Sequence, residues 1–281
     1  MEKKREKLIL GSRGNLALKL KERFSDAITI PRSEFLNWST PDDIRKILQG
    51  RDVDIYVAIG IISKHATKQD LERVNLGIPK LVSEAISNTN SRLITFGSIM
   101  EKSKKICEEN PYINTKYRLS KYLEDKLPSE IFLHLRMHTL YGGAKPNTEM
   151  FLGQLFESIK NRANFSMTSG KQVREYHHID DDIDAIEVLM TKGCRGVQEI
   201  THGEALRLFE IANKVLQHFK LGEMLRVGEI TEIPAEIFSP IGVKSVELHE
   251  VNFRPSIEGI ITYLSQCLNE RDNKDRQFPN S

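Results

Sequence analysis

Short apolar runs alternate with longer amphipathic stretches through the first half of the chain. Five apolar runs have the length of buried strands: 8–10, 27–30, 55–59, 92–96 and 131–137. Apolar residues at helical spacing occupy 16–23 and 70–87, and a further helix is expected to start near Pro111. Strands that alternate with helices predict an α/β fold built on a doubly wound parallel sheet.

The local composition changes at about Gly142, where Gly, Pro and Asn become frequent. Patterns that predict helices and short strands resume after this stretch. The sequence therefore predicts a first domain over 1–141 and a smaller α/β lobe over 142–281. Residues 172–200 are expected to return to the core of the first domain.

Composition narrows the class of protein. The 281 residues include 41 Lys and Arg against 39 Asp and Glu, for a net charge of +2, which gives no reason to expect nucleic acid or a membrane surface as partner. Cys107, Cys194 and Cys267 are far apart, which suits a reducing compartment. With no spanning run and no signal peptide in the pattern, we expect a cytoplasmic protein.

A glycine-rich turn follows the first predicted strand. Its residues are Gly11, Ser12, Arg13, Gly14, Asn15, Leu16 and Ala17. Glycine frees the backbone at the turn, Gly14 allows close approach to a pyrophosphate, and the small Ala17 lets helix and strand pack closely. With a strand before it and a helix after it, the turn predicts a dinucleotide site in a Rossmann-type domain, the alternative being an ordinary tight turn.

The end of the second predicted strand bears on the choice of cofactor. Proteins that prefer NAD commonly carry an acidic residue there, whereas Ile30 is followed here by Pro31, Arg32 and Ser33. Arg32, together with Arg13, could bind a 2′-phosphate through charge-assisted hydrogen bonds. The sequence favours NADP(H) over NAD(H), unless both are ordinary surface arginines.

Three residues suggest proton-transfer chemistry. Ser98 ends the fourth predicted strand, and Tyr112 and Lys116 are four residues apart on one helix. The spacing puts phenol and ammonium on one helix face, where the ammonium is expected to depress the phenol pKa and to bind the cofactor ribose. Ser98 could then share the proton relay to a carbonyl group.

The order of glycine turn, strand-end serine and Tyr-x-x-x-Lys resembles the extended short-chain dehydrogenases/reductases, the NAD-dependent epimerase/dehydratase family. That resemblance implies an enzyme of nucleotide sugars, most similar to its GDP-fucose-synthase branch. It also implies roles for residues elsewhere in the chain. Ala58, Ile59, Gly60, Met137 and His138 would contact the cofactor, Asn75 matches a helix asparagine, and Thr139, Arg174 and His177 would bind substrate beside Ser98 and Tyr112.

A second Tyr-x-x-x-Lys, Tyr117 with Lys121, is a rival for the catalytic pair. Asn110 as helix cap and Pro111 in the first turn place Tyr112 near the helix start. Starting from Lys121 leaves little chain before Arg136 to finish the helix and form the next strand. The sequence therefore favours Tyr112 and Lys116.

The stretch from His177 to Asp182 combines histidines with aspartates, which raises the question of a metal. Because alternation along a strand sends His177 and His178 to opposite faces, we expect no metal site. One histidine would instead line the sugar pocket, and the aspartates would cap a helix over 183–191. His138 is expected beside the nicotinamide, or buried and satisfied.

Taken together, these patterns predict an NADP-dependent reductase of a keto group in a nucleotide-linked deoxysugar. Ile99 and Met100 stand where the resemblance would place the Asp-Glu pair of a dehydratase. A nucleotide-sugar epimerase and a non-catalytic NADP-sensing regulator are the alternatives. A homodimer is also possible, with Val82, Ile86, Leu119 and Leu123 facing either the second subunit or the sheet.

Overall fold

The computed structural model describes residues 5–62, 65–232 and 235–277, and only the backbone of 270–277. The chain divides into two compact units. The first comprises Met1–Met137, Ile183–Thr201 and Gly242–Glu250, and the second comprises His138–Asp182, His202–Ile241 and Val251–Ser281. Within the described part of the chain, no helix is both long and apolar enough to cross a membrane.

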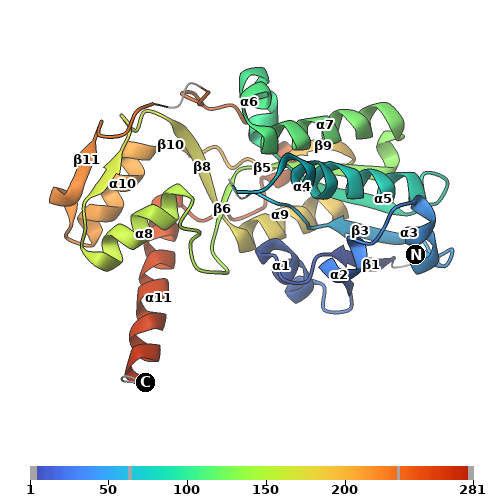
Figure 1. Cartoon of the computed structure of the whole chain (residues 1–281), viewed down its shortest axis with the longest axis horizontal. Helices are drawn as coiled ribbons and strands as arrows, with labels where there is room; N and C mark the ends of the chain where they lie inside the picture. Colours follow the sequence, from blue (N-terminus) through green and yellow to red (C-terminus); the bar gives the residue numbers. More distant parts are fainter. Residues whose placement is uncertain (1–4, 63–64, 233–234, 278–281) are drawn as a thin grey trace. The chain divides into compact units, whose positions relative to one another are not determined.

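A six-stranded sheet forms the centre of the first unit (Figure 1). Its strands are β1 (Glu6–Leu10), β2 (Ile28–Ile30), β3 (Val53–Val57), β4 (Arg92–Ser98), β5 (Phe132–Met137) and β9 (Gly196–Glu199). Their order is β2-β1-β3-β4-β5-β9, and every neighbouring pair is parallel. The chain leaves β1 toward β2 on one side and resumes at β3 on the other. Doubly wound sheets bind ligands at such a change of direction, beyond the carboxyl ends of the strands.

Helices cover both faces of this sheet, as buried parallel strands require (Figure 1). The first unit contains α1 (Asn15–Arg23), α2 (Arg32–Phe35), α3 (Pro41–Leu48), α4 (Lys68–Glu72), the π-helical turn η1 (Arg73–Gly77), α5 (Ile78–Ile86), η2 (Ile99–Lys102), α6 (Lys104–Glu109), α7 (Pro111–Lys126), η3 (Ser129–Ile131), most of α9 (Ile179–Thr191), and η5 (Val246–Leu248). Helices α3, α5 and α7 pack on one face. On the other face α1 lies beside α9, joined by ion pairs from Arg23 to Asp184 and Glu187. The prediction of a doubly wound α/β fold is confirmed.

The apolar faces of α5 and α7 pack against the sheet. Val82, Ile86 and Leu123 are 0% exposed and Leu119 is 1% exposed, all within one core cluster with strand residues. These four side chains therefore face the sheet, and they do not offer the dimer seam that the sequence left open.

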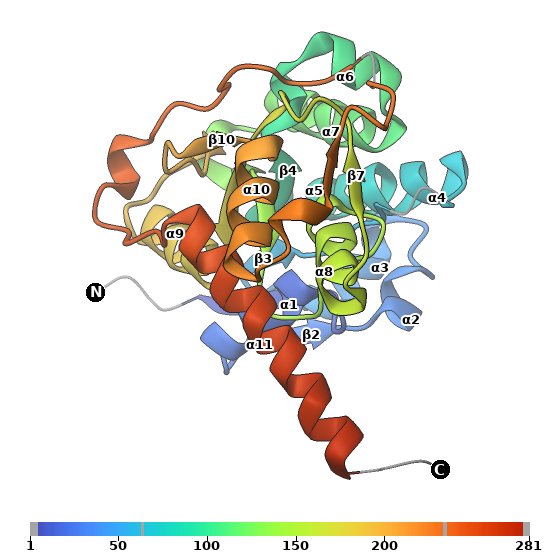
Figure 2. The ribbon, with the colours of Figure 1, turned by 90° about the vertical axis from the view of Figure 1, so that its left-hand side faces the viewer.

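The second unit is smaller and mixed. A three-stranded sheet has the order β10-β8-β6, with β6 (Thr139–Tyr141) parallel and β10 (Ala205–Arg207) antiparallel to β8 (Val173–His178). A parallel pair, β7 (Phe165–Met167) and β11 (Leu225–Val227), lies beside α8 (Phe151–Asn161), α10 (Leu208–His218), η4 (Gly222–Met224) and α11 (Ser256–Gln277). Figure 2 shows these three α-helices, with α11 running on past the other two. Leu155, Tyr176, Val215 and Ile260 form the centre of its core.

Two boundaries differ from the sequence expectation. Helix α9 begins at Ile179 rather than at 183, because Asp180, Asp181 and Asp182 occupy its first turn, where negative charge favours a helix. Strand β8 stays in the second unit, so the returning segment starts at Ile183 rather than at 172, and 242–250 also joins the first unit.

Candidate active site

The glycine turn after β1 is sterically determined. Gly11 has a φ of +107°, and a Cβ at this position would lie 2.8 Å from the carbonyl oxygen of Ala58 and 3.3 Å from the Cβ of Ala17. Any side chain at position 11 would therefore be strained and would push α1 and β3 apart. The structure explains both the glycine at the turn and the small residue at position 17.

Helix α1 directs an open N-terminus toward the carboxyl ends of the strands. Gly14 is its N-cap residue and offers no side chain to its first turn, and a Cβ there would come no closer than 3.8 Å to Ala58. Ser12, Asn15 and Leu16 belong to the same turn. A helix N-terminus with room beside it is the arrangement that binds a pyrophosphate through backbone N–H groups and the helix dipole.

Arg13 and Arg32 are both exposed at this edge of the sheet. The Gly11 N–H donates to the Ile30 carbonyl oxygen at 2.9 Å, which ties the end of β1 to the end of β2. Arg32 begins α2 directly after Pro31. The two arginines thus follow neighbouring strand ends, and both guanidinium groups are accessible to solvent or to an anion.

The end of β3 leads into a second backbone turn that a side chain stabilises. Asn75 is buried in η1, where its Oδ1 accepts from Ile61 N–H at 2.9 Å and its Nδ2 donates to the Ile61 carbonyl at 3.0 Å. A Cβ on Gly60 would lie 3.7 Å from the Nζ of Lys116. The turn that includes Ala58, Ile59 and Gly60 is therefore held beside Lys116.

Ser98, Tyr112 and Lys116 converge on the carboxyl end of β4. Asn110 caps α7 by accepting from the N–H groups of Tyr112 at 3.0 Å and Ile113 at 3.2 Å, as the sequence predicts. The Nζ of Lys116 is buried and donates to the Phe96 carbonyl at 2.8 Å, two residues before Ser98. The first turns of α7 and the last residues of β4 thus form one small constellation.

Burial dominates the electrostatics of this constellation. Burial, aided by the charge of Glu101, raises the pKa of Tyr112 to about 12, and burial lowers the pKa of Lys116 to about 8. The Nζ of Lys116 lies 5.9 Å from the centroid of the Tyr112 ring. Depression of the phenol pKa by the ammonium stays a prediction.

The rival pair lies in a different environment. Lys121 is exposed and forms an ion pair with Glu124 at 2.8 Å, one turn along the solvent side of α7. Lys116, by contrast, is 6% exposed and reaches a strand end. The geometry of the two lysines favours Tyr112 and Lys116 as the reactive pair.

A buried ionic cluster beneath Ser98 was not anticipated from the sequence. The Ser98 N–H donates to Glu101 Oε1 at 2.7 Å, and Glu101 Oε2 lies 3.1 Å from His134 Nε2 and 3.4 Å from Arg136 Nε. Thr95 Oγ1 lies 2.7 Å from His134 Nδ1. The hydrogen bonds and the positive neighbours hold the pKa of Glu101 below its usual range despite its burial. The available sequence signal was a pair of polar residues, His134 and Arg136, two apart in an otherwise apolar strand.

In the second unit, the predicted substrate arginine already has a partner. Arg174 of β8 forms an ion pair with Glu236, and both side chains are largely buried. Arg174 also donates to the Val173 carbonyl at 2.9 Å. Thr139 begins β6 and is paired in register with Tyr176 of β8. An anion bound by Arg174 would share the guanidinium with Glu236 or take its place.

His177 lies in a closed cluster. Its Nδ1 is 2.6 Å from Asp182 Oδ1 and its Nε2 is 2.8 Å from Glu175 Oε1, and these carboxylates raise its pKa to about 9 although burial opposes them. The side chain is 1% exposed. With both ring nitrogens engaged, His177 can support a pocket but offers no ring nitrogen to a substrate, contrary to the sequence expectation.

The same cluster bears on metal binding. Ligand atoms of His138, Glu175 and His177 lie within 4.8 Å of one another. Spacing alone could not show this, because His138 comes from the segment that precedes β6. A doubly hydrogen-bonded imidazolium has no lone pair for a metal ion, so the contacts favour a charge-paired histidine.

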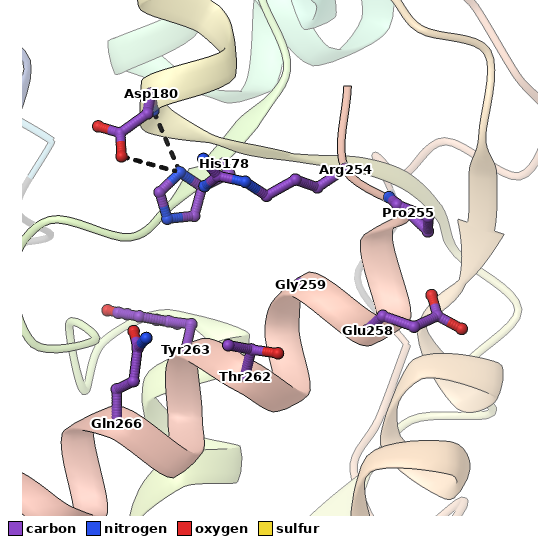
Figure 3. Close-up of a pocket in the computed structure, with 9 residues that line it drawn as sticks. All are labelled: His178, Asp180, Arg254, Pro255, Glu258, Gly259, Thr262, Tyr263 and Gln266. Atoms are coloured by element: carbon purple, nitrogen blue, oxygen red, sulfur yellow. Dashed lines mark hydrogen bonds and ion pairs between the residues drawn. The ribbon is translucent and has the colours of Figure 1, made fainter. Parts of the chain in front are cut away.

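A separate pocket of about 500 Å³ lies between the start of α9 and the first turns of α11 (Figure 3). In Figure 3 the Nδ1 of His178 accepts a hydrogen bond from the Asp180 N–H and lies 3.6 Å from the Asp180 carboxylate. The His178 ring faces the α11 side chains across the pocket. Its lining residues are His178, Asp180, Arg254, Pro255, Glu258, Gly259, Thr262, Tyr263 and Gln266. The residues predicted to bind substrate do not line it.

Comparison with known proteins identifies the family of this chain. The model of the family described as "NAD dependent epimerase/dehydratase family" matches residues 6–201. No curated protein matches the chain in sequence.

Solved structures share the fold at low identity. A UDP-N-acetylglucosamine 4-epimerase from Methanobrevibacter ruminantium M1 is 13% identical, with 97% of this chain and 99% of that chain covered and a TM-score of 0.73. A dTDP-4-dehydrorhamnose reductase from Bacillus anthracis, solved with NADP, is 16% identical over 94% of this chain and 100% of that chain, with a TM-score of 0.71.

A dTDP-glucose 4,6-dehydratase from the same organism, solved with NAD, is 13% identical over 96% and 98% of the two chains, with a TM-score of 0.72. These similarities establish a shared fold, whereas the family match spans most of the chain and includes the glycine turn, Ser98, Tyr112 and Lys116. This protein is a member of the NAD-dependent epimerase/dehydratase family, a family of NAD(P)-dependent enzymes that act on nucleotide sugars.

Proposed function

We propose that this protein is an NADP(H)-dependent reductase of a keto group in a nucleotide-linked sugar. Bound NADPH would supply the hydride to the carbonyl carbon. Tyr112 would give its phenolic proton to the oxygen, and Ser98 would donate a hydrogen bond that orients the carbonyl. Lys116 would bind the nicotinamide ribose beside the Gly60 turn.

The placement of Ser98, Tyr112 and Lys116 is the observation that carries this proposal. Lys116 donates to the Phe96 carbonyl at 2.8 Å, two residues before Ser98, and its Nζ lies 5.9 Å from the centroid of the Tyr112 ring. The phenol of Tyr112 is protonated at neutral pH, as a reductase needs, because the tyrosine must act as an acid. The preference for reduction over epimerisation rests on the cofactor site, and the cofactor titration below tests it.

The cofactor side supports NADP(H). No acidic residue directly follows β2, and the exposed Arg13 and Arg32 follow the neighbouring ends of β1 and β2. Met137 ends β5 at the same edge of the sheet. In the second unit, we assign Thr139 and Arg174 to the nucleotide-linked substrate, and His138 to the nicotinamide side. Oligomeric state remains a separate prediction, to be measured by light scattering.

Cofactor titration by calorimetry tests the proposal. NADPH is expected to bind more tightly than NADH, and Arg32→Ala is expected to weaken NADPH by about tenfold to a hundredfold, the value of a charge-assisted contact, while leaving NADH unchanged. Lys46→Ala, which removes an exposed positive charge from α3, is the matched control and should change neither affinity. Equal binding of both cofactors by the wild type would contradict the NADP assignment and favour an epimerase.

A further inference from the structure

The Glu101 cluster is more elaborate than packing requires. The side chains of Glu101 in η2 and His134 in β5 are both 0% exposed, so a carboxylate and an imidazole have been removed from water beside the end of β4. Apolar residues of similar volume would fill the same space without that desolvation penalty. The contacts of this polar cluster indicate a role beyond packing.

Gly97 provides the space that the cluster occupies. A Cβ on Gly97 would lie 2.3 Å from both Glu101 Oε1 and His134 Nε2, so only glycine at this strand position lets the two groups meet. Gly97, Glu101 and His134 therefore form one structural unit directly before Ser98. None of the three belongs to the Ser98, Tyr112 and Lys116 set.

The cluster acts on Ser98 through the turn. Glu101 accepts the Ser98 N–H at 2.7 Å, and the Ser98 Oγ accepts the Met100 N–H at 3.3 Å, which together form a reciprocal cap on η2. Because the Oγ is used as an acceptor, its proton is directed elsewhere and can be donated to a carbonyl oxygen. Arg136 and His134 in turn fix the carboxylate.

We propose that Glu101 is a positioning residue of the active site: its carboxylate, fixed by His134 and Arg136, sets the turn that holds the Ser98 hydroxyl as a hydrogen-bond donor. This inference rests on the proposed function for Ser98 and Tyr112. The charge of Glu101 opposes formation of a tyrosinate and so keeps Tyr112 in the acid form. His134 and Arg136 of β5, Cys107 of α6, and Tyr112 and Lys116 of α7 are the titratable groups that face it.

The first test needs no substrate. Glu101→Gln keeps an acceptor for the Ser98 N–H and removes the charge. In protein labelled with ¹³C at tyrosine Cζ, with Tyr112→Phe used to assign the signal, the Tyr112 titration midpoint is expected to fall by about half a unit to one unit. Asp54→Asn, which removes another buried carboxylate of this sheet from its partner Arg92, is the control and should leave the Tyr112 midpoint unchanged. An unchanged midpoint in folded Glu101→Gln would overturn the electrostatic part.

The second test separates positioning from stability. The double variant Glu101→Leu with His134→Leu replaces the carboxylate and the imidazole together by apolar groups. Because Thr95, Arg136 and the Ser98 N–H each lose a partner, its melting temperature is expected to fall by several degrees, so kcat is measured per folded molecule below the unfolding transition. If Glu101 positions Ser98, kcat should fall at least tenfold while the Kd for NADPH stays the same. A double variant with wild-type kcat would show a structural role alone and refute the proposal. Absence of keto-sugar reduction by the wild type would refute the proposed function instead, while the tyrosine titration would still report on Glu101.

Discussion

Each unit of this protein buries a histidine against carboxylate groups, and the two clusters differ in what they adjoin. In the first unit, the Glu101 and His134 pair hydrogen-bonds to the backbone of Ser98 and lies near Tyr112. In the second unit, His177 lies between Glu175 and Asp182, and Glu175 also accepts the backbone N–H groups of His202 and Gly203. The first cluster adjoins reactive groups, whereas the second joins β8 to α9 and to a neighbouring turn.

A buried histidine and carboxylate have to be judged by their neighbours. Both clusters are almost fully buried, and both carry a carboxylate whose pKa lies below its usual range. From their contacts we expect the first cluster to affect catalysis and the second to affect stability. Variants in the two units should therefore change different measurements.

The largest effect is expected at Tyr112. Tyr112→Phe removes the proton donor and should lower kcat for keto-sugar reduction by about 10² to 10⁴-fold, since general acid catalysis contributes that much. The melting temperature should stay within a few degrees of the wild type. Steady-state kinetics with thermal unfolding checks both, and Tyr117→Phe is the matched control that should retain activity.

The opposite pattern is expected at His177. His177→Leu leaves Glu175 and Asp182 facing each other without a cation, so the free energy of unfolding should fall by about 3 to 5 kcal/mol. Activity per folded molecule should stay near that of the wild type. Chemical denaturation measures the first quantity. A large loss of kcat at full stability would show that the second cluster also serves chemistry.

The pH dependence of stability should carry the signature of His177. Its pKa is about 9 when folded, above the ordinary value of 6.5, because the native state stabilises the protonated imidazole through Asp182 and Glu175. This contribution is fully present below about pH 6.5 and is lost as pH rises through about 9, by up to about 3 kcal/mol. Denaturation from pH 6 to pH 9.5 should show this loss in the wild type and a flatter profile in His177→Leu.

A smaller effect is expected at Glu236. Glu236→Gln frees Arg174 from its ion pair, so a nucleoside diphosphate would no longer compete with a carboxylate of the protein itself. The apparent Kd for the nucleotide part should fall by about threefold to tenfold, because more molecules hold Arg174 ready to bind. Calorimetry with a nucleoside diphosphate measures this. A weaker affinity in the variant would show that Glu236 orients Arg174.

Local features of the sequence were enough to predict the doubly wound architecture of the first unit and to propose the residues of its site. Apolar runs of strand length, glycines where φ is positive, and a helix cap before Tyr112 are local features, so one segment at a time can be read from its own residues. Gly11, Asn110 and Lys116 were all found in this way, because each acts within or next to its own element.

Tertiary structure decided what depends on residues distant in the chain. Glu101 meets His134 only because β4 and β5 pair in parallel, and His138 meets His177 only because β6 pairs with β8. The pKa of Tyr112 likewise follows from burial and from Glu101, which no spacing along α7 reveals. Periodicity reports which face of an element is buried, whereas the charges that share the buried space are set by which elements become neighbours.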